Sequence, residues 1–235
     1  MPSPFGRGGE KMPFIIIAID GPAGAGKGTL ARHLAHIYQL NHLDTGLLYR
    51  AVALKMVEGG EDIADKEAAV RTALSLKTTD LKNPSLRDEA IGNAASHIAI
   101  FPEVRTILLE FQRKFAKKPS SGKQGVVLDG RDIGRVVLPK ASCKIFVTAS
   151  PRVRAERRLK ELHQKGIDSI YEAVLEDIKT RDERDRMRKV SPLHPAEDAF
   201  ILDTSGLGID EVIKKACLFV DSIYPEAHKK GTPIV

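Results

Sequence analysis

An apolar run that leads into a glycine-rich loop constrains the fold of this chain more than any other feature of its sequence. Residues 14–19 read Phe-Ile-Ile-Ile-Ala-Ile, which predicts a buried strand. The apolar spacing after residue 29 predicts a helix. Glycines let several backbone N–H groups between these elements point inward, and the helix N-terminus adds the positive end of its dipole. The pattern therefore predicts a phosphate-binding loop made of Gly21, Pro22, Ala23, Gly24, Ala25, Gly26, Lys27, Gly28 and Thr29.

Lys27 gives this loop its chemistry. A lysine at the start of the helix supplies a movable positive charge for the outer phosphates of a nucleotide. We expect it to stand exposed in the empty loop. The plainer alternative is a glycine-rich turn that binds nothing, but such a turn has no need of a Gly-Lys pair at the helix start.

Strands and helices alternate along the rest of the chain. Further strands are expected just before Asp44 and at 125–129, 144–148 and 200–203. Helices are expected at 29–40, 47–57, 104–115, 151–163, 170–188 and 209–224. This alternation predicts an α/β fold with a central parallel sheet of about five strands flanked by helices. Ligands of such sheets bind beyond the carboxyl ends of the strands.

The length of 235 residues suits one α/β domain with an appendage better than two domains. The expected boundaries are a flexible leader at 1–13, a single domain at 14–225 with its core at 14–58 and 103–225, an acceptor-binding insertion at about 59–102, an arginine-rich lid at about 160–172 and a flexible tail at 226–235.

Composition narrows the class of protein. Hydrophobic residues make up 42% and charged residues 29%, which predicts a globular chain and argues against global disorder. The longest apolar run is too short to cross a bilayer, and Cys143 and Cys217 are outside any metal-ligand spacing. We therefore expect a reduced, cytoplasmic protein without a membrane partner. The net charge of +6 suits binding of phosphorylated ligands or nucleic acid. Many of the arginines are concentrated between residues 152 and 188.

Residues 128–132 read Leu-Asp-Gly-Arg-Asp and follow a buried strand. Asp129 falls on the expected ligand side, where its carboxylate could hold Mg²⁺ through water together with Thr29. Arg131 could bridge a donor and an acceptor phosphate and neutralise charge during transfer. The plainer alternative is an Asp-Gly turn with a surface ion pair between Arg131 and Asp132.

Arg50 is a weaker candidate for binding the acceptor. It lies where a helix could aim its guanidinium back at the donor phosphates, and a planar fork suits a phosphate better than a point charge does. Equally, it could be a surface arginine on a helix capped by Asp44 and Thr45.

Two charged helices in the last third of the chain carry most of the arginines. On the first helix, one face carries Arg154, Arg157 and Arg158. On the second helix, one face carries Arg181, Arg184, Asp185 and Arg188. One interpretation is a solvated face with Asp177, Arg181 and Asp185 paired, worth about 0.3–0.5 kcal/mol per pair. Beside a phosphate loop, the pattern favours a lid that folds over phosphates and excludes water.

With these motifs the chain resembles the bacterial cytidylate kinases over nearly everything from Ile16 to Tyr224. The Gly-Lys-Gly-Thr variant of the loop is similar to that of nucleoside monophosphate kinases, and the Leu-Asp-Gly-Arg-Asp motif separates this family from adenylate kinases, which carry Phe-Pro-Arg after Asp-Gly. The other segments that carry the resemblance are Leu-Asp-Thr-Gly at 43–46, Tyr-Arg-Ala-Val-Ala at 49–53, Asn-Ala-Ala-Ser at 93–96, Phe-Pro-Glu-Val-Arg at 101–105, Arg-Asp-Glu-Arg-Asp-Arg at 181–186 and Leu-Asp-Thr-Ser at 202–205.

The resemblance implies the P-loop nucleoside monophosphate kinase fold and transfer of a phosphoryl group from ATP to CMP, and to dCMP, with Mg²⁺. It implies cytosine contacts from Thr45, Arg105, Asp132 and Arg188, ribose contacts from Ser96, Arg181 and Asp185, and acceptor phosphate contacts from Arg50 and Arg131. We expect Lys27, Arg131 and Arg184 to act in catalysis, in a monomer that binds no nucleic acid. The departure from the family lies at 59–87, where this chain is shorter and more helical than many members.

Two other functions stay open at this point. The chain could be another small-molecule P-loop kinase, with AMP, UMP or shikimate as acceptor. It could also be a nucleic-acid-binding ATPase that uses its basic surface, but the arginines have no aromatic stacking residues among them.

Overall fold

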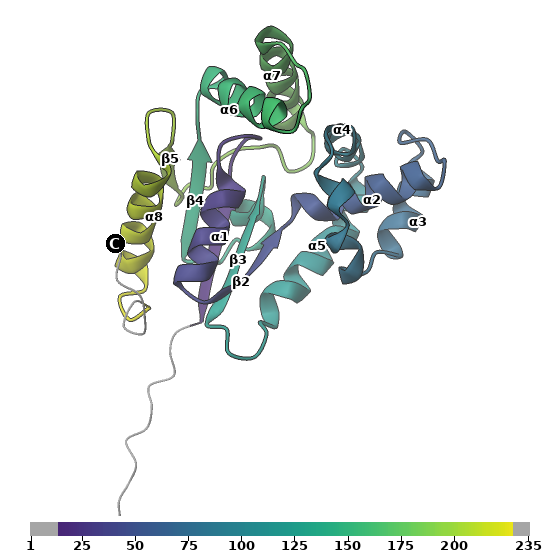
Figure 1. The fold of residues 1–235 in the computed structure, drawn as a ribbon. Helices are drawn as coiled ribbons and strands as arrows, with labels where there is room; N and C mark the ends of the chain where they lie inside the picture. The colour runs from purple at the N-terminus through teal and green to yellow at the C-terminus, as the bar shows by residue number, and fades with distance from the viewer. Residues whose placement is uncertain (1–13, 228–235) are drawn as a thin grey trace, which may run out of the picture.

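The computed structural model describes residues 14–227, and a parallel sheet of five strands lies at its centre (Figure 1). In spatial order the strands are β2 (Leu40–Asp44), β3 (Gly125–Gly130), β1 (Ile15–Asp20), β4 (Cys143–Thr148) and β5 (Phe200–Asp203). The predicted parallel sheet of about five strands is confirmed. Because every pairing is parallel, the carboxyl ends of the strands lie at one edge, where Asp129 is level with Ile19 of β1 and with Asp44 of β2.

The strands are apolar throughout because helices cover both faces of the sheet. Ile15, Ile17 and Ile19 of β1 pack into one core, and Ala18 points to the other, as the alternation of side chains along a strand requires. The first core is formed with α1 (Lys27–Ile37) and α8 (Ile209–Ile223), and the second with α2 (Gly46–Glu58) and α5 (Pro102–Lys117). The helix that we expected from residue 104 begins at Pro102, a residue that suits the first turn of a helix.

The segment between α2 and α5 is helical, as the sequence suggested. It contains α3 (Lys66–Leu74), two short 3₁₀ turns at Thr78–Lys82 and Pro84–Arg87, and α4 (Glu89–Ile98). Buried residues of these elements, such as Ala69, Leu86 and Ile98, join the core beneath α2. The insertion is therefore packed onto the domain and brings one end of α4 to the ligand edge of the sheet (Figure 1).

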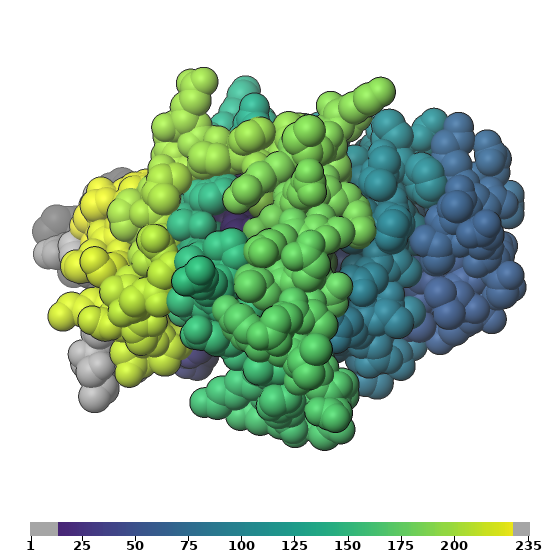
Figure 2. Space-filling model, turned by 90° about the horizontal axis from the view of Figure 1, so that it is seen from above, coloured from purple at the N-terminus to yellow at the C-terminus, as the bar shows by residue number. Residues whose placement is uncertain are grey.

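Two helices make up the segment that we expected to act as an arginine-rich lid, and we keep the name lid for it. They are α6 (Pro151–Gln164) and α7 (Tyr171–Met187), and they share a small apolar cluster of their own made of Ala155, Leu162, Val174 and Ile178. Seen from above, the lid (green) lies between α8 (yellow) and the insertion (blue) in Figure 2. The range expected for the lid, about 160–172, covers the tip at which α6 passes into α7.

The expected leader at 1–13 lies outside the described residues, as does most of the expected tail. Ala227, at the start of that tail, is buried and packs into the core beneath α8, so the packed chain extends at least to this residue. Within residues 14–227, no helix is long and apolar enough to cross a membrane.

Candidate active site

The predicted phosphate loop connects β1 to α1 and requires its glycines. Gly21 has φ +146°, and a Cβ there would lie 1.9 Å from the carbonyl oxygen of Val147 on β4. Gly26 has φ +93° and immediately precedes α1, a backbone conformation that L side chains rarely adopt. Only glycine therefore lets this loop turn tightly against the sheet and open into the helix.

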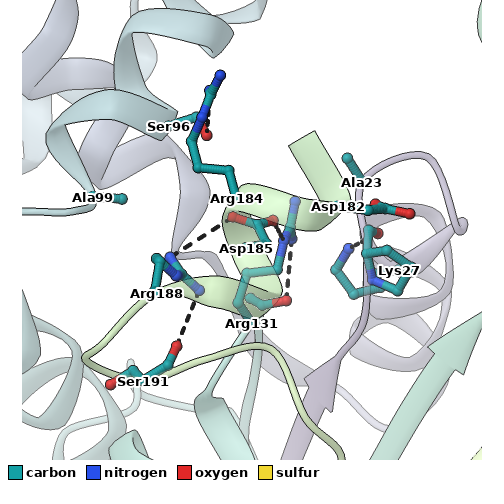
Figure 3. Close-up of polar contacts among 12 residues, drawn as sticks. Ala23, Lys27, Ser96, Ala99, Arg131, Asp182, Arg184, Asp185, Arg188 and Ser191 are labelled. Atoms are coloured by element: carbon teal, nitrogen blue, oxygen red, sulfur yellow. Dashed lines mark hydrogen bonds and ion pairs between the residues drawn. The ribbon is translucent and has the colours of Figure 1, made fainter. Parts of the chain in front are cut away.

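The expectation of an exposed Lys27 is wrong. Its side chain is buried, and Nζ donates a 2.7 Å hydrogen bond to the carbonyl oxygen of Pro22, so the ammonium folds back into its own loop (Figure 3). Burial, with the nearby charge of Arg131, lowers the pKa of Lys27 to about 7. Burial in the loop thus disfavours the charged form of Lys27, and an anion bound beside the ammonium would favour it.

A cavity of about 350 Å³ lies over this loop. Six of the nine predicted ATP-binding residues line it: Ala23, Gly24, Gly26, Lys27, Gly28 and Thr29. The other three residues of the loop, Gly21, Pro22 and Ala25, are buried and do not line the cavity. The opposite wall comes from the lid, through residues such as Arg158 and Arg181. We call this space the donor cavity.

A second hollow of about 70 Å³ adjoins it. All nine residues that the resemblance assigned to CMP line this hollow: Thr45, Arg50, Ser96, Arg105, Arg131, Asp132, Arg181, Asp185 and Arg188. We call it the acceptor hollow. The donor cavity and the acceptor hollow share five lining residues, which are Gly46, Arg50, Gly130, Arg131 and Arg181. Three arginines therefore stand at the boundary between the two spaces.

Asp132 lies deep in the acceptor hollow and pairs with Arg105, not with Arg131. Arg105 Nη2 is 2.5 Å from Asp132 Oδ2, and Arg105 Nη1 donates to the carbonyl oxygen of Ala99. The Arg105 guanidinium also lies 5.7 Å from the ring centre of Tyr49. The surface pair between Arg131 and Asp132 that we considered is not formed, because the chain turns Asp132 inward after Gly130.

Asp185 of α7 pairs with two arginines of the acceptor hollow. Arg131 Nε donates to Asp185 Oδ2 at 2.8 Å, and Arg188 Nη1 lies 3.8 Å from Asp185 Oδ1 (Figure 3). Although burial opposes charge here, the pair with Arg131 holds the pKa of Asp185 below its usual value and raises that of Arg131. Instead of the partner Arg181 that the helical spacing suggested, Asp185 pairs with Arg131, 54 positions away in the sequence, and with Arg188, three positions away.

Three arginines of the acceptor hollow have a buried Nε with no hydrogen-bond partner among the described residues. They are Arg105, Arg181 and Arg188. Burial, with the nearby charge of Arg131, lowers the pKa of Arg181 to about 10. Buried donors without partners are rare in folded proteins, so this cluster is suited to a ligand rich in acceptor atoms.

Two arginines expected in the site are engaged by neighbouring elements. Arg50 lines both spaces, but its Nη1 donates to the carbonyl oxygens of Leu86 and Asp88 in the insertion. Arg184 lines neither space, and its Nη1 donates to Ser96 Oγ at 3.1 Å. The structure thus brings Arg181, and not Arg184, to the boundary.

Asp129 lines the donor cavity together with Thr29. Its Oδ1 lies 2.6 Å from Nε2 of His42, a residue that the sequence did not single out. Asp44 lies close to it, and burial together with the charge of Asp129 raises the pKa of Asp44. Two close carboxylates beside a hydroxyl form a set of oxygen donors that suits Mg²⁺. Residues 14–227 contain no cluster of three or more His, Cys, Asp or Glu side chains that could hold a metal unaided.

Two further buried groups support the site in roles that the sequence did not reveal. Asp20, at the end of β1, accepts hydrogen bonds from the backbone N–H groups of Ile133 and Gly134, just after Asp132. Arg154, which we placed in a basic patch on the lid, is only 1% exposed. Nothing in the sequence distinguishes it from Arg157 and Arg158, since all three lie in a run of charged residues.

The fold and the loop define the chain as a P-loop α/β protein with a helical insertion and a lid. The model of the cytidylate kinase family matches residues 17–222. The cytidylate kinase of Methylocella silvestris is 51% identical over 219 residues, covering 93% of this chain and 99% of that protein. The cytidylate kinase of Paramagnetospirillum magneticum is 55% identical over 207 residues, covering 88% and 98%. The chain belongs to the cytidylate kinase family.

A solved structure, that of an uncharacterized protein from Eubacterium ventriosum, matches with a TM-score of 0.51 at 17% identity. The match covers 88% of this chain and 99% of that one, and the likeness concerns the fold alone.

Proposed function

We propose that this protein transfers the γ-phosphoryl group of ATP to CMP, and to dCMP, yielding ADP and the nucleoside diphosphate. The bond between the γ-phosphorus and the oxygen that stays with ADP breaks, and a bond to an oxygen of the acceptor phosphate forms. That oxygen is already ionised near neutral pH, so no general base is required. Membership of the cytidylate kinase family supports the choice of acceptor.

The donor nucleotide would lie in the donor cavity. The backbone N–H groups around Gly24 and Gly26 would bind its outer phosphates, and Lys27 would exchange the Pro22 carbonyl for a phosphate oxygen. Anionic phosphate favours the charged form of the lysine and offsets the effect of burial on its pKa. Thr29 and Asp129 would hold Mg²⁺, partly through water, and the ion would neutralise charge on the phosphates.

The observation that carries the proposal is the set of buried, unpartnered Nε groups of Arg105, Arg181 and Arg188 in the acceptor hollow beside Asp132. Cytosine offers acceptor atoms at O2 and N3 to the arginines and an exocyclic amine to a carboxylate. The ribose and phosphate offer further acceptors. CMP is therefore complementary to the hollow at both its base and its phosphate.

The acceptor phosphate would approach the donor at the boundary that Arg50, Arg131 and Arg181 share. Positive charge at this point stabilises a transition state in which negative charge is spread over the transferred group. The lid forms the opposite wall of the donor cavity and would exclude water, which limits wasteful hydrolysis of ATP.

A coupled ADP-release assay tests the proposal with CMP, dCMP, UMP, AMP and shikimate as acceptors. We expect CMP to give a kcat/KM at least about tenfold above that of UMP and AMP. A thermal melt with each nucleotide adds a binding test, since only a ligand of the folded state raises Tm. Faster transfer to AMP or shikimate, or ATP hydrolysis that depends on an oligonucleotide and not on CMP, would contradict the proposal.

A further inference from the structure

Arg154 of α6 joins three separate parts of the site. Its Nε donates to the carbonyl oxygen of Ala149, where β4 leads into α6, at 2.9 Å. Its Nη1 donates to the carbonyl oxygen of Ala23 in the phosphate loop at 3.0 Å. The same nitrogen and Nη2 bind the two carboxylate oxygens of Asp182 on α7 at 2.9 and 2.5 Å. The guanidinium is thus fully buried and bound on every side.

This arrangement attaches α7 to the phosphate loop. Asp182 lies beside Ala23 in Figure 3, and Arg154 bridges the two. The loop also rests on the stem of this side chain, because a Cβ at Gly24 would lie 3.4 Å from Cβ of Arg154. A bidentate pair buried to this degree fixes both distance and orientation. A shift of the loop is therefore transmitted to α7.

α7 carries three residues of the acceptor hollow. Arg181 adjoins Asp182 in the chain, and Asp185 follows one turn later and holds Arg131. Arg188, at the end of the helix, completes the set. Because a helix moves as a rigid element, the position of Asp182 relative to the loop fixes where these side chains stand.

We propose that the Arg154–Asp182 pair couples the two substrate sites. Phosphate bound to the loop fixes Ala23, Arg154 and α7 in the position at which the acceptor hollow fits its ligand, so each substrate raises the affinity for the other. Arg154 and Asp182 are positioning residues in this scheme, since neither lines the donor cavity or the acceptor hollow. The inference rests on the proposed function, in that it takes the acceptor hollow to bind CMP.

Calorimetric titration measures the coupling directly. The Kd for CMP is determined with and without a saturating, non-hydrolysable ATP analogue and Mg²⁺, and the ratio of the two values is the coupling factor. We expect a factor of about 5 to 150 in the wild type. Asp182→Asn and Arg154→Lys should bring it below about 2 while the analogue alone binds within about threefold of wild type. Arg152→Lys, on an exposed arginine of the same helix, should leave the factor unchanged.

The double variant Arg154→Met with Asp182→Leu keeps the test valid if the single variants do not fold. Removing both partners leaves no buried charge unpaired, and such replacements are often tolerated. A wild type without coupling, or folded variants that keep the wild-type factor, would overturn the inference and leave the pair a structural tie alone.

Hydrogen exchange separates failure of this inference from failure of the proposed function. In the wild type, the analogue alone should slow exchange of the amides at 185–188, which lie outside the donor cavity, and in the variants it should not. This readout needs no acceptor. If CMP fails to bind the wild type, the proposed function fails, and the exchange comparison still supports or overturns the coupling.

Discussion

Nε2 of His42 on β2 lies 2.6 Å from Oδ1 of Asp129 on the neighbouring strand β3. Oδ2 of the same carboxylate faces the phosphate loop, 3.8 Å from the position that a Cβ on Gly28 would take. The histidine therefore fixes one oxygen of Asp129 and leaves the other directed at the donor cavity. Partners of this kind orient groups that hold a metal and are worth about 10- to 100-fold in metal affinity.

We predict that His42→Leu raises the Mg²⁺ concentration for half-maximal activity by about tenfold, because Asp129 is no longer held in place. The measurement is a Mg²⁺ titration of ADP release. Binding of Mn²⁺ to the complex with a non-hydrolysable ATP analogue gives a second readout by electron paramagnetic resonance. His36→Leu, on the exposed face of α1, is the matched control. An identical Mg²⁺ requirement in both variants would mean that His42 only packs against the strand.

The low pKa of Lys27, about 7, predicts that ATP binding takes up a proton. A pKa near 7 favours the neutral lysine in the free enzyme as the pH rises above neutrality, whereas phosphate favours the charged form. Proton uptake per ATP should thus be small well below pH 7 and approach one well above it. Calorimetry in two buffers of different ionisation enthalpy measures it. Lys27→Arg should show none, and uptake that does not change with pH would refute the assignment.

The residues that line the acceptor hollow were indicated by the resemblance to the cytidylate kinases, but the resemblance did not give their partners. Motifs around Thr45, Ser96 and Asp132 carried that resemblance, and all three residues line the hollow. The pairings of Asp132 with Arg105 and of Asp185 with Arg131 join residues 27 and 54 positions apart. Helical spacing predicts only pairs three or four positions apart, so it favoured Arg181 as the partner of Asp185.

Burial was the other property that the sequence did not reveal. Lys27 and Arg154 are long, charged side chains, and such residues are almost never fully buried unless they are paired. Here the partners are carbonyl groups of the phosphate loop and, for Arg154, a carboxylate on a different helix. Both kinds of partner depend on the tertiary fold, and hence the local sequence around Lys27 and Arg154 did not reveal that these side chains are buried.

Asp132 is expected to discriminate the base. Asp132→Ala removes a charge-assisted hydrogen bond to the cytosine amine worth about 1.5–3 kcal/mol, which is about 10- to 150-fold in kcat/KM for CMP. UMP has a carbonyl at this position, which Asp132 repels, so the variant should lose much less with UMP. The variant also leaves Arg105 buried without its carboxylate, and this cost is common to both substrates. The CMP/UMP ratio of kcat/KM is therefore the decisive quantity, and an unchanged ratio would exclude a role in reading the base.

Asp185 is expected to contribute to binding of the ribose as well as to the transfer step. Asp185→Ala releases Arg131, so kcat should fall with both CMP and dCMP. If Asp185 also binds the 2′-hydroxyl, KM should rise about fivefold more for CMP than for dCMP, the scale of one hydrogen bond. KM and kcat for both acceptors are measured on the wild type, Asp185→Ala and Asp185→Asn, which keeps the shape of the side chain. Equal changes in KM for the two acceptors would restrict Asp185 to holding Arg131.

Arg181 and Arg184 are separated by one turn of α7 and offer a matched comparison for the transfer step. Arg181 lines both the donor cavity and the acceptor hollow, and its buried Nε has no partner within the described chain. Arg184 lines neither and donates to Ser96 Oγ. A guanidinium at the boundary acts on the charge of the transition state, so Arg181→Met should lower kcat by at least about 10². Arg184→Met should lower kcat by less than about tenfold and act mainly on the KM for CMP, because it frees Ser96.

The comparison is made with saturating Mg²⁺-ATP and a full range of CMP concentrations, so that kcat and KM are separated for each variant. Thermal melts of both variants are compared with that of the wild type to exclude a general loss of folding. Methionine keeps the unbranched apolar part of the arginine side chain, so we expect both variants to fold. A larger fall in kcat for Arg184→Met than for Arg181→Met would reverse the assignment and favour the arginine that the sequence first suggested. Geometry predicts the opposite order, because Arg181, unlike Arg184, lies at the boundary between the donor cavity and the acceptor hollow.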